Sequence, residues 1–176
     1  MTPNPDWTYV ADTVMGGVSQ GQVTREVVQG RKADRLTGQV SLDNDGGFIQ
    51  MATDLRPDGG VVDLSGSAGL ELTVLGNGEV YEIRLRTDDL TRPWQSYRLA
   101  FTAPDVWTCV RIPFAELAPH RTQVPLNLSK ARRVGILAIG RAFSADVALA
   151  GMRIYDAGTA GQDADADVAC HPSVTR

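Results

Sequence analysis

The polar side chains that are best suited to bind a ligand lie in two short segments, residues 82–86 and 96–98. Charged residues alternate with apolar ones in the first segment, and serine and arginine flank an aromatic residue in the second. Because successive side chains of a strand point to opposite faces, each polar set shares one face. Arginines on such a face bind carboxylates, sugars or the acidic patch of a protein. If the two strands are neighbours, the candidate binding face consists of Glu82, Arg84, Arg86, Ser96 and Arg98.

The same pattern also fits an ordinary solvated sheet face. Glu71 and Glu82 would then balance the arginines, and the face would need no ligand. The tryptophans leave a similar choice open. Trp94 and Trp107 are candidates for stacking on a ligand ring, but packing in the core or anchoring of a loop is the commoner role of scattered tryptophans.

A nucleophile-elbow pattern, Gly-x-Ser-x-Gly, occurs at residues 17–21. That motif requires a buried strand before the serine, a helix after it and a histidine later in the chain. A β-branched run follows Ser19 instead, and the only histidines are His120, in a loop rich in proline and arginine, and His171. Gln22 stands where a phosphate-binding loop requires lysine. We therefore expect a glycine-rich turn, no catalytic residue and no enzymatic activity.

Metal-ligand patterns in the sequence are incomplete. The aspartates at 163, 165 and 167 are spaced like part of a calcium loop but lack its glycine and its closing glutamate. Cys170 and His171 are adjacent without a further pair of ligands. We expect neither a metal nor a cofactor. Cys109 lies in an apolar run and is expected to be a buried thiol.

The chain has 176 residues and a net charge of −4. This balance does not suit a DNA-binding or membrane-surface protein, because such proteins need clustered positive charge. The first residues show neither the basic nor the apolar region of a signal peptide, and no apolar stretch approaches the roughly 18 residues of a membrane helix. We expect a cytoplasmic protein with reduced cysteines, no DNA partner and no direct membrane insertion.

Alternation of apolar and polar residues recurs along the chain and predicts strands. An apolar run at 133–139 predicts a central strand, and the shifted apolar phase at Gly151 predicts a bulge in the last strand. No window of a dozen residues has a helical period. Strands with one buried face are expected at residues 36–42, 70–74, 81–86, 96–101 and 147–155.

Turn-forming residues separate these strands. Asn44–Gly47 and Gly76–Gly78 predict hairpins, because Asn, Asp and Gly accept positive φ. Short helical turns are expected at 114–117 and 127–132. About nine strands without helices between them predict an all-β, two-sheet sandwich. We expect an N-terminal extension at 1–5, the sandwich at 6–155 and a flexible acidic tail at 156–176.

The segment Asp12–Ser19, read with Trp7 before it, resembles the opening signature of a known family. Further matching stretches follow in order at 38–48, 63–65, 69–72, 81–86, 107–114 and 134–136. The family is that of the NADH:ubiquinone oxidoreductase intermediate-associated protein 30. The resemblance implies a galactose-binding-like β-sandwich of jelly-roll type, and the chain looks like a stand-alone, bacterial member.

The signature loops also have a direct physical interpretation. Gly16 and Gly17 allow a tight reversal, and Asp12 and Ser19 can bond the exposed amides of the turn. A second loop offers similar chemistry through Asn44 and Gly47. We expect both loops at one end of the sandwich, where they either frame a ligand site or fasten the fold.

The resemblance implies a non-enzymatic function. Mitochondrial members of the family act as assembly chaperones for respiratory complex I, so the resemblance implies a subunit or an assembly intermediate of a respiratory complex as the partner. The alternative is a jelly-roll module that binds a sugar or another small polar ligand.

Overall fold

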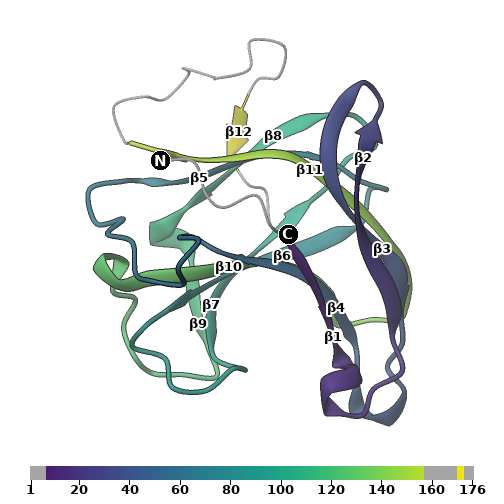
Figure 1. The fold of residues 1–176 in the computed structure, drawn as a ribbon, viewed down its shortest axis with the longest axis horizontal. Helices are drawn as coiled ribbons and strands as arrows, with labels where there is room; N and C mark the ends of the chain where they lie inside the picture. Colours follow the sequence, from purple (N-terminus) through teal and green to yellow (C-terminus); the bar gives the residue numbers. More distant parts are fainter. Residues whose placement is uncertain (1–6, 157–169, 173–176) are drawn as a thin grey trace.

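The computed structural model describes residues 7–156 and 170–172, which form two β-sheets packed face to face (Figure 1). The strand order is β1-β4-β10-β6-β7-β9 in the first sheet and β12-β8-β5-β11-β3-β2 in the second. Neighbouring strands are antiparallel except for β12, which runs parallel to β8. The predicted all-β jelly-roll sandwich is confirmed.

The bounds of the elements are as follows. The first sheet consists of β1 (Thr8–Ala11), β4 (Phe48–Asp54), β6 (Val80–Thr87), β7 (Ser96–Thr102), β9 (Ala118–His120) and β10 (Ala131–Ile139). The second consists of β2 (Gln20–Val28), β3 (Arg31–Val40), β5 (Gly69–Leu75), β8 (Thr108–Pro113), β11 (Phe143–Tyr155) and β12 (Cys170–Pro172). Four short 3-10 turns lie between strands: η1 (Asp12–Met15), η2 (Asp43–Asp45), η3 (Phe114–Glu116) and η4 (Leu128–Lys130).

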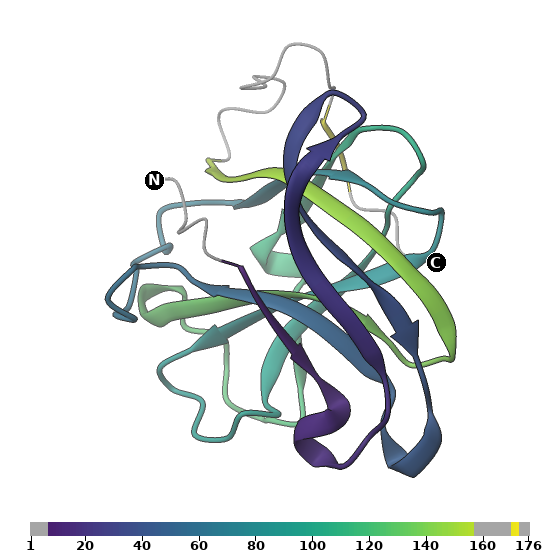
Figure 2. The ribbon, with the colours of Figure 1, turned by 45° about the vertical axis from the view of Figure 1, so that its right-hand side comes forward.

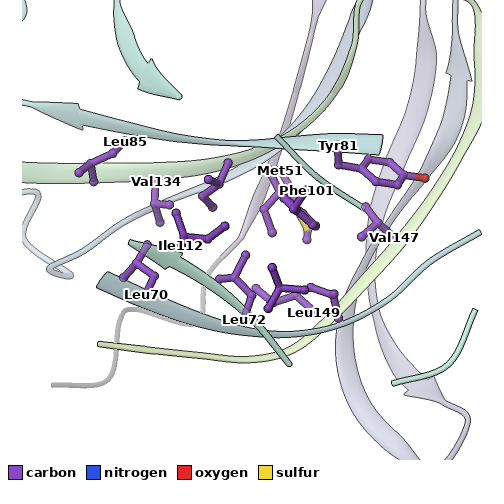
Figure 3. Close-up of a cluster of buried hydrophobic side chains, with 14 of the residues drawn as sticks. Met51, Leu70, Leu72, Tyr81, Leu85, Phe101, Ile112, Val134, Val147 and Leu149 are labelled. Atoms are coloured by element: carbon purple, nitrogen blue, oxygen red, sulfur yellow. The ribbon is translucent and has the colours of Figure 1, made fainter. Parts of the chain in front are cut away.

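The side chains between the sheets form one hydrophobic core (Figure 3). On β6 the alternation is strict: Tyr81, Ile83 and Leu85 are buried, and the residues between them face outward. Fully burying a large apolar side chain contributes roughly 1.5–3 kcal/mol, so this core holds both sheets together. The labelled members of the cluster are Met51, Leu70, Leu72, Tyr81, Leu85, Phe101, Ile112, Val134, Val147 and Leu149.

The predicted elements agree with the structure in several details. The apolar run at 133–139 lies in β10, between β4 and β6 and therefore in the middle of its sheet. The bulge predicted in the last strand occurs as a register shift between Leu149 and Gly151. The two predicted helical turns are the short η3 and η4. Within the described residues, no helix has the length and apolar character needed to cross a membrane.

Two turns were predicted as hairpins, and this prediction is wrong. The chain does reverse with positive φ at Asn44 (58°) and Gly78 (81°). However, the strands on either side of each turn belong to different sheets, since β3 is followed by β4 and β5 by β6. Turn residues set the local backbone path, and the sheet that the next strand joins depends on where its apolar face is buried.

The C-terminal segment and the cysteines also depart from expectation. Three residues of the predicted flexible tail form β12, and the rest of that tail, apart from Asp156, lies outside the described residues. β12 places the backbone of Cys170 opposite Cys109 of β8. Cys109 is buried, as predicted, but it is disulfide-bonded and not a free thiol. The expectation of a reducing cytoplasm implied reduced cysteines, and that implication is wrong for Cys109; disulfides persist in oxidising compartments.

Candidate binding face

The outer face of the first sheet brings the predicted polar residues together. Arg84 of β6 lies directly opposite Arg98 of β7, and Ser96 of β7 pairs with His120 of β9. On the other side of β6, Arg133 of β10 pairs with Arg86. The apolar neighbours of these residues fill the core, so this set faces outward. We call it the arginine face, and it consists of Glu82, Arg84, Arg86, Ser96, Arg98, His120 and Arg133.

Glu82 is the acidic centre of the arginine face. Nη2 of Arg84 donates to its Oε1 at 3.0 Å and lies 3.4 Å from its Oε2, and Nη1 of Arg98 lies 3.5 Å from Oε1. The side chains of Arg84 and Glu82 are 12% and 15% exposed, whereas that of Arg98 is 43% exposed. Nε of Arg84 is buried and has no hydrogen-bond partner. Arg84 therefore uses only one of its nitrogens to hold the glutamate.

Arg86 is held by backbone oxygens. Its Nε donates to the carbonyl of Gln95 at 3.1 Å, and its Nη2 donates to the carbonyl of Arg92 at 2.9 Å. Burial, and then the positive charges of Arg132 and Arg133, lower the pKa of Arg86. An arginine still stays charged at neutral pH. Among the described residues, no carboxylate forms an ion pair with Arg86, so its charge is not locally neutralised.

Ser96 and His120 complete the edge of the face. Ser96 is buried, and its hydroxyl has no hydrogen-bond partner. Burial lowers the pKa of His120, and the positive charges of Arg84, Arg98 and Arg121 lower it further. The imidazole is therefore neutral at neutral pH. The sequence analysis placed His120 in a loop, because a strand of three residues that includes Pro119 has no recognisable alternation.

The charge of the arginine face is positive in a chain whose net charge is −4. Four arginines face two carboxylates there: Glu82, and Asp54 of β4, which accepts a hydrogen bond from Arg133 at 2.8 Å. Glu71 does not neutralise this face, contrary to one expectation. It lies on the second sheet and accepts hydrogen bonds from Arg111 and Arg153.

A further polar side chain reaches this face from β4. Gly135 lies opposite Arg84 in the register, and a Cβ placed on it would lie 2.7 Å from Nε2 of Gln50. The amide of Gln50 therefore lies over Gly135, next to the strand that carries Arg84. Gln50 could not be identified from the sequence, because the order β4-β10-β6 is not visible from the chain.

The two candidate tryptophans do not share a site. Trp94 lies in the loop before β7 and is 52% exposed, with the guanidinium of Arg92 5.8 Å from its ring centroid. Trp107 lies beside the second sheet, where it packs on a small apolar cluster and its indole N–H donates to the carbonyl of Val28 at 3.1 Å. Only Trp94 lies in a loop that also contacts the arginine face, through the carbonyl oxygens that hold Arg86.

The signature loops meet at the carboxylate of Asp12, which is fully buried. Asp12 accepts hydrogen bonds from the hydroxyl of Ser19 at 2.5 Å and from its backbone N–H at 3.1 Å. It also accepts from the N–H groups of Gly47 at 2.6 Å and Phe48 at 3.2 Å. The two loops thus lie at the same end of the sandwich, as predicted. Burial alone would raise the pKa of Asp12, but these hydrogen bonds outweigh it and lower the pKa.

Two glycines of the signature, Gly16 and Gly17, allow the chain to turn closely around the carboxylate of Asp12. Gly16 has a φ of 87°, in the left-handed region that favours glycine. A Cβ on Gly17 would lie 2.4 Å from Cγ of Asp12. Ser19 also accepts from the N–H of Ser41 at 2.9 Å. Asn44 is exposed and has a left-handed backbone. These contacts are those of a fastened turn, and they lie beside β1 and β4, across the first sheet from β7 and β9.

Within the described residues, Ser19 has contacts that fasten a turn, and the possible metal ligands do not cluster. The hydroxyl of Ser19 is bonded to the carboxylate of Asp12 and to the backbone of Ser41. Across residues 7–156 and 170–172, no three His, Cys, Asp or Glu side chains gather into a group that could hold a metal ion.

The family model for complex I intermediate-associated protein 30 (CIA30) matches residues 2–149. The chain belongs to the CIA30 family. The family resemblance drawn from the signature is thereby confirmed, and the matched region of this CIA30 chain includes the whole arginine face and both signature loops. No curated protein matches the chain in sequence.

Solved structures with the same fold include carbohydrate-binding modules. The family 11 module from Clostridium thermocellum, solved in complex with a β-1,3-1,4-mixed-linked tetrasaccharide, has a TM-score of 0.67 and 13% identity, over 86% of this chain and 89% of the module. The family 30 module of the cellulosomal cellulase Cel9D-Cel44B of the same organism has a TM-score of 0.65 and 18% identity, over 89% of this chain and 95% of the module. At such identities the CIA30 chain shares their fold alone.

Proposed function

We propose that this CIA30 chain is a non-catalytic binding protein that holds a protein partner on its arginine face during assembly of respiratory complex I. The family supplies the setting, as its name refers to an intermediate of complex I. The observation that carries the proposal is the excess of guanidinium groups on this face, with Arg86 paired only to backbone oxygens.

The chemistry of the face favours a carboxylate-bearing partner. Guanidinium groups form paired hydrogen bonds with carboxylates, and these charge-assisted bonds are stronger than neutral ones. Arg98 is the most exposed of the four arginines on this face, and it is positioned to meet a partner first. A positive face on a negatively charged chain also orients an acidic partner as it approaches.

The test is capture of complex I subunits by the tagged protein from a lysate of its own cells. We expect these subunits to be retained by the wild type and lost with Arg98→Glu. The control is Arg25→Glu, which makes the same charge change on an exposed arginine of the second sheet. Retention of the same subunits by Arg98→Glu, or their absence from the wild-type capture, would contradict the proposal.

A second candidate function is binding of a carbohydrate. It is supported by the exposed Trp94 beside the arginine face, because an exposed indole ring can stack on a sugar ring. The two carbohydrate-binding modules with this fold add a precedent. Retardation of the protein in a gel containing mixed-linkage β-glucan, abolished by Trp94→Ala, would favour this function. Unretarded migration would exclude that glucan as the ligand.

A further inference from the structure

We propose that Glu82 is a built-in competitor on the arginine face: it holds the guanidinium groups of Arg84 and Arg98 until a carboxylate of an acidic peptide segment displaces it. This inference rests on the proposed function and adds the ligand chemistry and the regulation of the same site. Glu82 already has the position of a bound ligand, since it contacts both arginines, one from its own strand and one from the neighbouring strand.

The hold of Glu82 on Arg84 is incomplete. The two residues are two positions apart on β6, so their side chains leave the strand side by side. In this arrangement only Nη2 of Arg84 reaches the carboxylate, at 3.0 and 3.4 Å. The strong arginine–carboxylate geometry instead uses two parallel N–H···O bonds. A carboxylate that is not tethered to β6 is free to approach Arg84 in that geometry.

A carboxylate bound at Arg84 would gain hydrogen bonds from two buried donors. Nε of Arg84 and the hydroxyl of Ser96 are both buried without a hydrogen-bond partner. Arg84 lies opposite Arg98, and Ser96 is two residues from Arg98 on the same face, so the two donors are diagonal neighbours. Neither atom is exposed to solvent, so a ligand reaches them only when the side chains above them move. Departure of Glu82 from Arg84 is such a movement.

The exposure of Arg98 allows this exchange. Arg98 is 43% exposed and lies 3.5 Å from Glu82, a longer contact than that of Arg84. Arg98 can therefore move outward and release Glu82, so that its guanidinium is free to pair with the incoming carboxylate. The exchange replaces one carboxylate on Arg84 with another, so the charge of the buried site is preserved. This avoids the high cost of leaving a buried guanidinium unpaired.

The experiment measures binding of a fluorescein-labelled hexaglutamate peptide at low salt by fluorescence anisotropy. Glu82→Gln removes the competing charge with almost no change in shape. We expect it to tighten binding about tenfold relative to the wild type, the change that corresponds to one charge-assisted hydrogen bond. Arg98→Ala should weaken binding. The double variant Glu82→Gln with Arg84→Ala should lose the gain.

The matched control is Glu26→Gln, which makes the same charge change on the second sheet. Its partner Arg35 stays bonded to Asp146 through two nitrogens, at 2.8 and 2.7 Å, so no guanidinium is released. We expect an unchanged affinity. If Glu26→Gln tightened peptide binding as much as Glu82→Gln does, the change in net charge would explain the higher affinity, and the proposal would be overturned.

The outcomes separate this inference from the proposed function. If the wild type binds the peptide and Arg98→Ala weakens binding, but Glu82→Gln does not tighten it, the competitor role is wrong and the binding face stands. If neither the wild type nor Glu82→Gln binds the peptide, the competitor role of Glu82 and the proposed binding of an acidic partner are both overturned. Binding of an oligogalacturonate without binding of the peptide would assign the site to acidic sugars and overturn the peptide assignment.

A spectroscopic measurement covers the case in which Glu82→Gln does not fold. In the wild type, the 1Hε–15Nε signal of Arg84, assigned with Arg84→Lys, should shift on saturation with the peptide, because Nε acquires a partner. An Arg84 signal that does not change while the peptide is bound would overturn the exchange.

Discussion

At the scale of single residues, Asp12 explains why the signature sequence has its form. One carboxylate accepts four hydrogen bonds and joins the loop after β1 to the loop before β4. Glycine at position 17 leaves room for that carboxylate, because a Cβ there would meet it at 2.4 Å. The types of these residues were readable from the sequence, whereas the convergence of two distant loops on one carboxylate was not.

The lowered pKa of Asp12 makes a prediction about acid stability. Because the folded pKa lies below the ordinary 3.8, the stabilisation is complete above that value and is lost as the pH falls through the folded pKa. At neutral pH we expect Asp12→Asn to destabilise the protein by roughly 3 kcal/mol, since hydrogen bonds to a buried charged group are lost. Urea unfolding of both proteins between neutral and strongly acidic pH measures the difference. A difference that does not shrink in acid would contradict this role.

Gly16 supports a second prediction at this scale. We expect Gly16→Val to destabilise the protein by about 2 kcal/mol and to lower the Tm by several degrees, because a β-branched residue resists a left-handed backbone. The control is Gly66→Val, at an exposed glycine with open space around its Cβ position and no positive φ. Equal melting of the two variants would show that strain at Gly16 is not the cause.

At the scale of elements, the patterns that could be read locally agree with the structure. Alternation of apolar and polar residues identified the buried face of β6. The change of apolar phase at Gly151 identified the bulge in β11. Pairings between distant segments were not readable. The longest hairpin consists of β2 and β3, which lie side by side in Figure 2. It turns at Gln29 and Gly30, which both have positive φ, and Gly30 was its only local signal. The three-residue strands β9 and β12 are too short to show alternation.

The link between β8 and β12 gives an element-scale prediction. With Cys109 disulfide-bonded, we expect reduction to lower the free energy of unfolding by roughly 2–4 kcal/mol, the typical contribution of a disulfide. The measurement is a pair of melting curves with and without dithiothreitol, supported by a thiol titration of the unreduced protein. Cys109→Ser should melt at one temperature under both conditions. A wild-type curve that does not respond to reductant would contradict the prediction.

At the scale of the whole molecule, the two outer faces of the sandwich differ in how their arginines are used. On the second sheet, Arg111 and Arg153 are bonded to Glu71, and Arg35 is bonded to Asp146 and Glu26. On the first sheet, the arginine face has more guanidinium groups than carboxylates. The sequence predicted which residues share this face but not that Glu71 lies on the opposite sheet, because the order of strands decides that.

The most direct test of the central claim asks which outer face touches the partner. A photo-cross-linking amino acid is placed at Ala118, which is exposed and lies opposite Arg98, or at Gln22, which is exposed on β2 of the second sheet. Both variants are irradiated in cells and their cross-linked products are identified. We predict that complex I subunits cross-link to the Ala118 variant and not to the Gln22 variant. Cross-links from Gln22 alone would contradict the assignment of the arginine face as the binding surface.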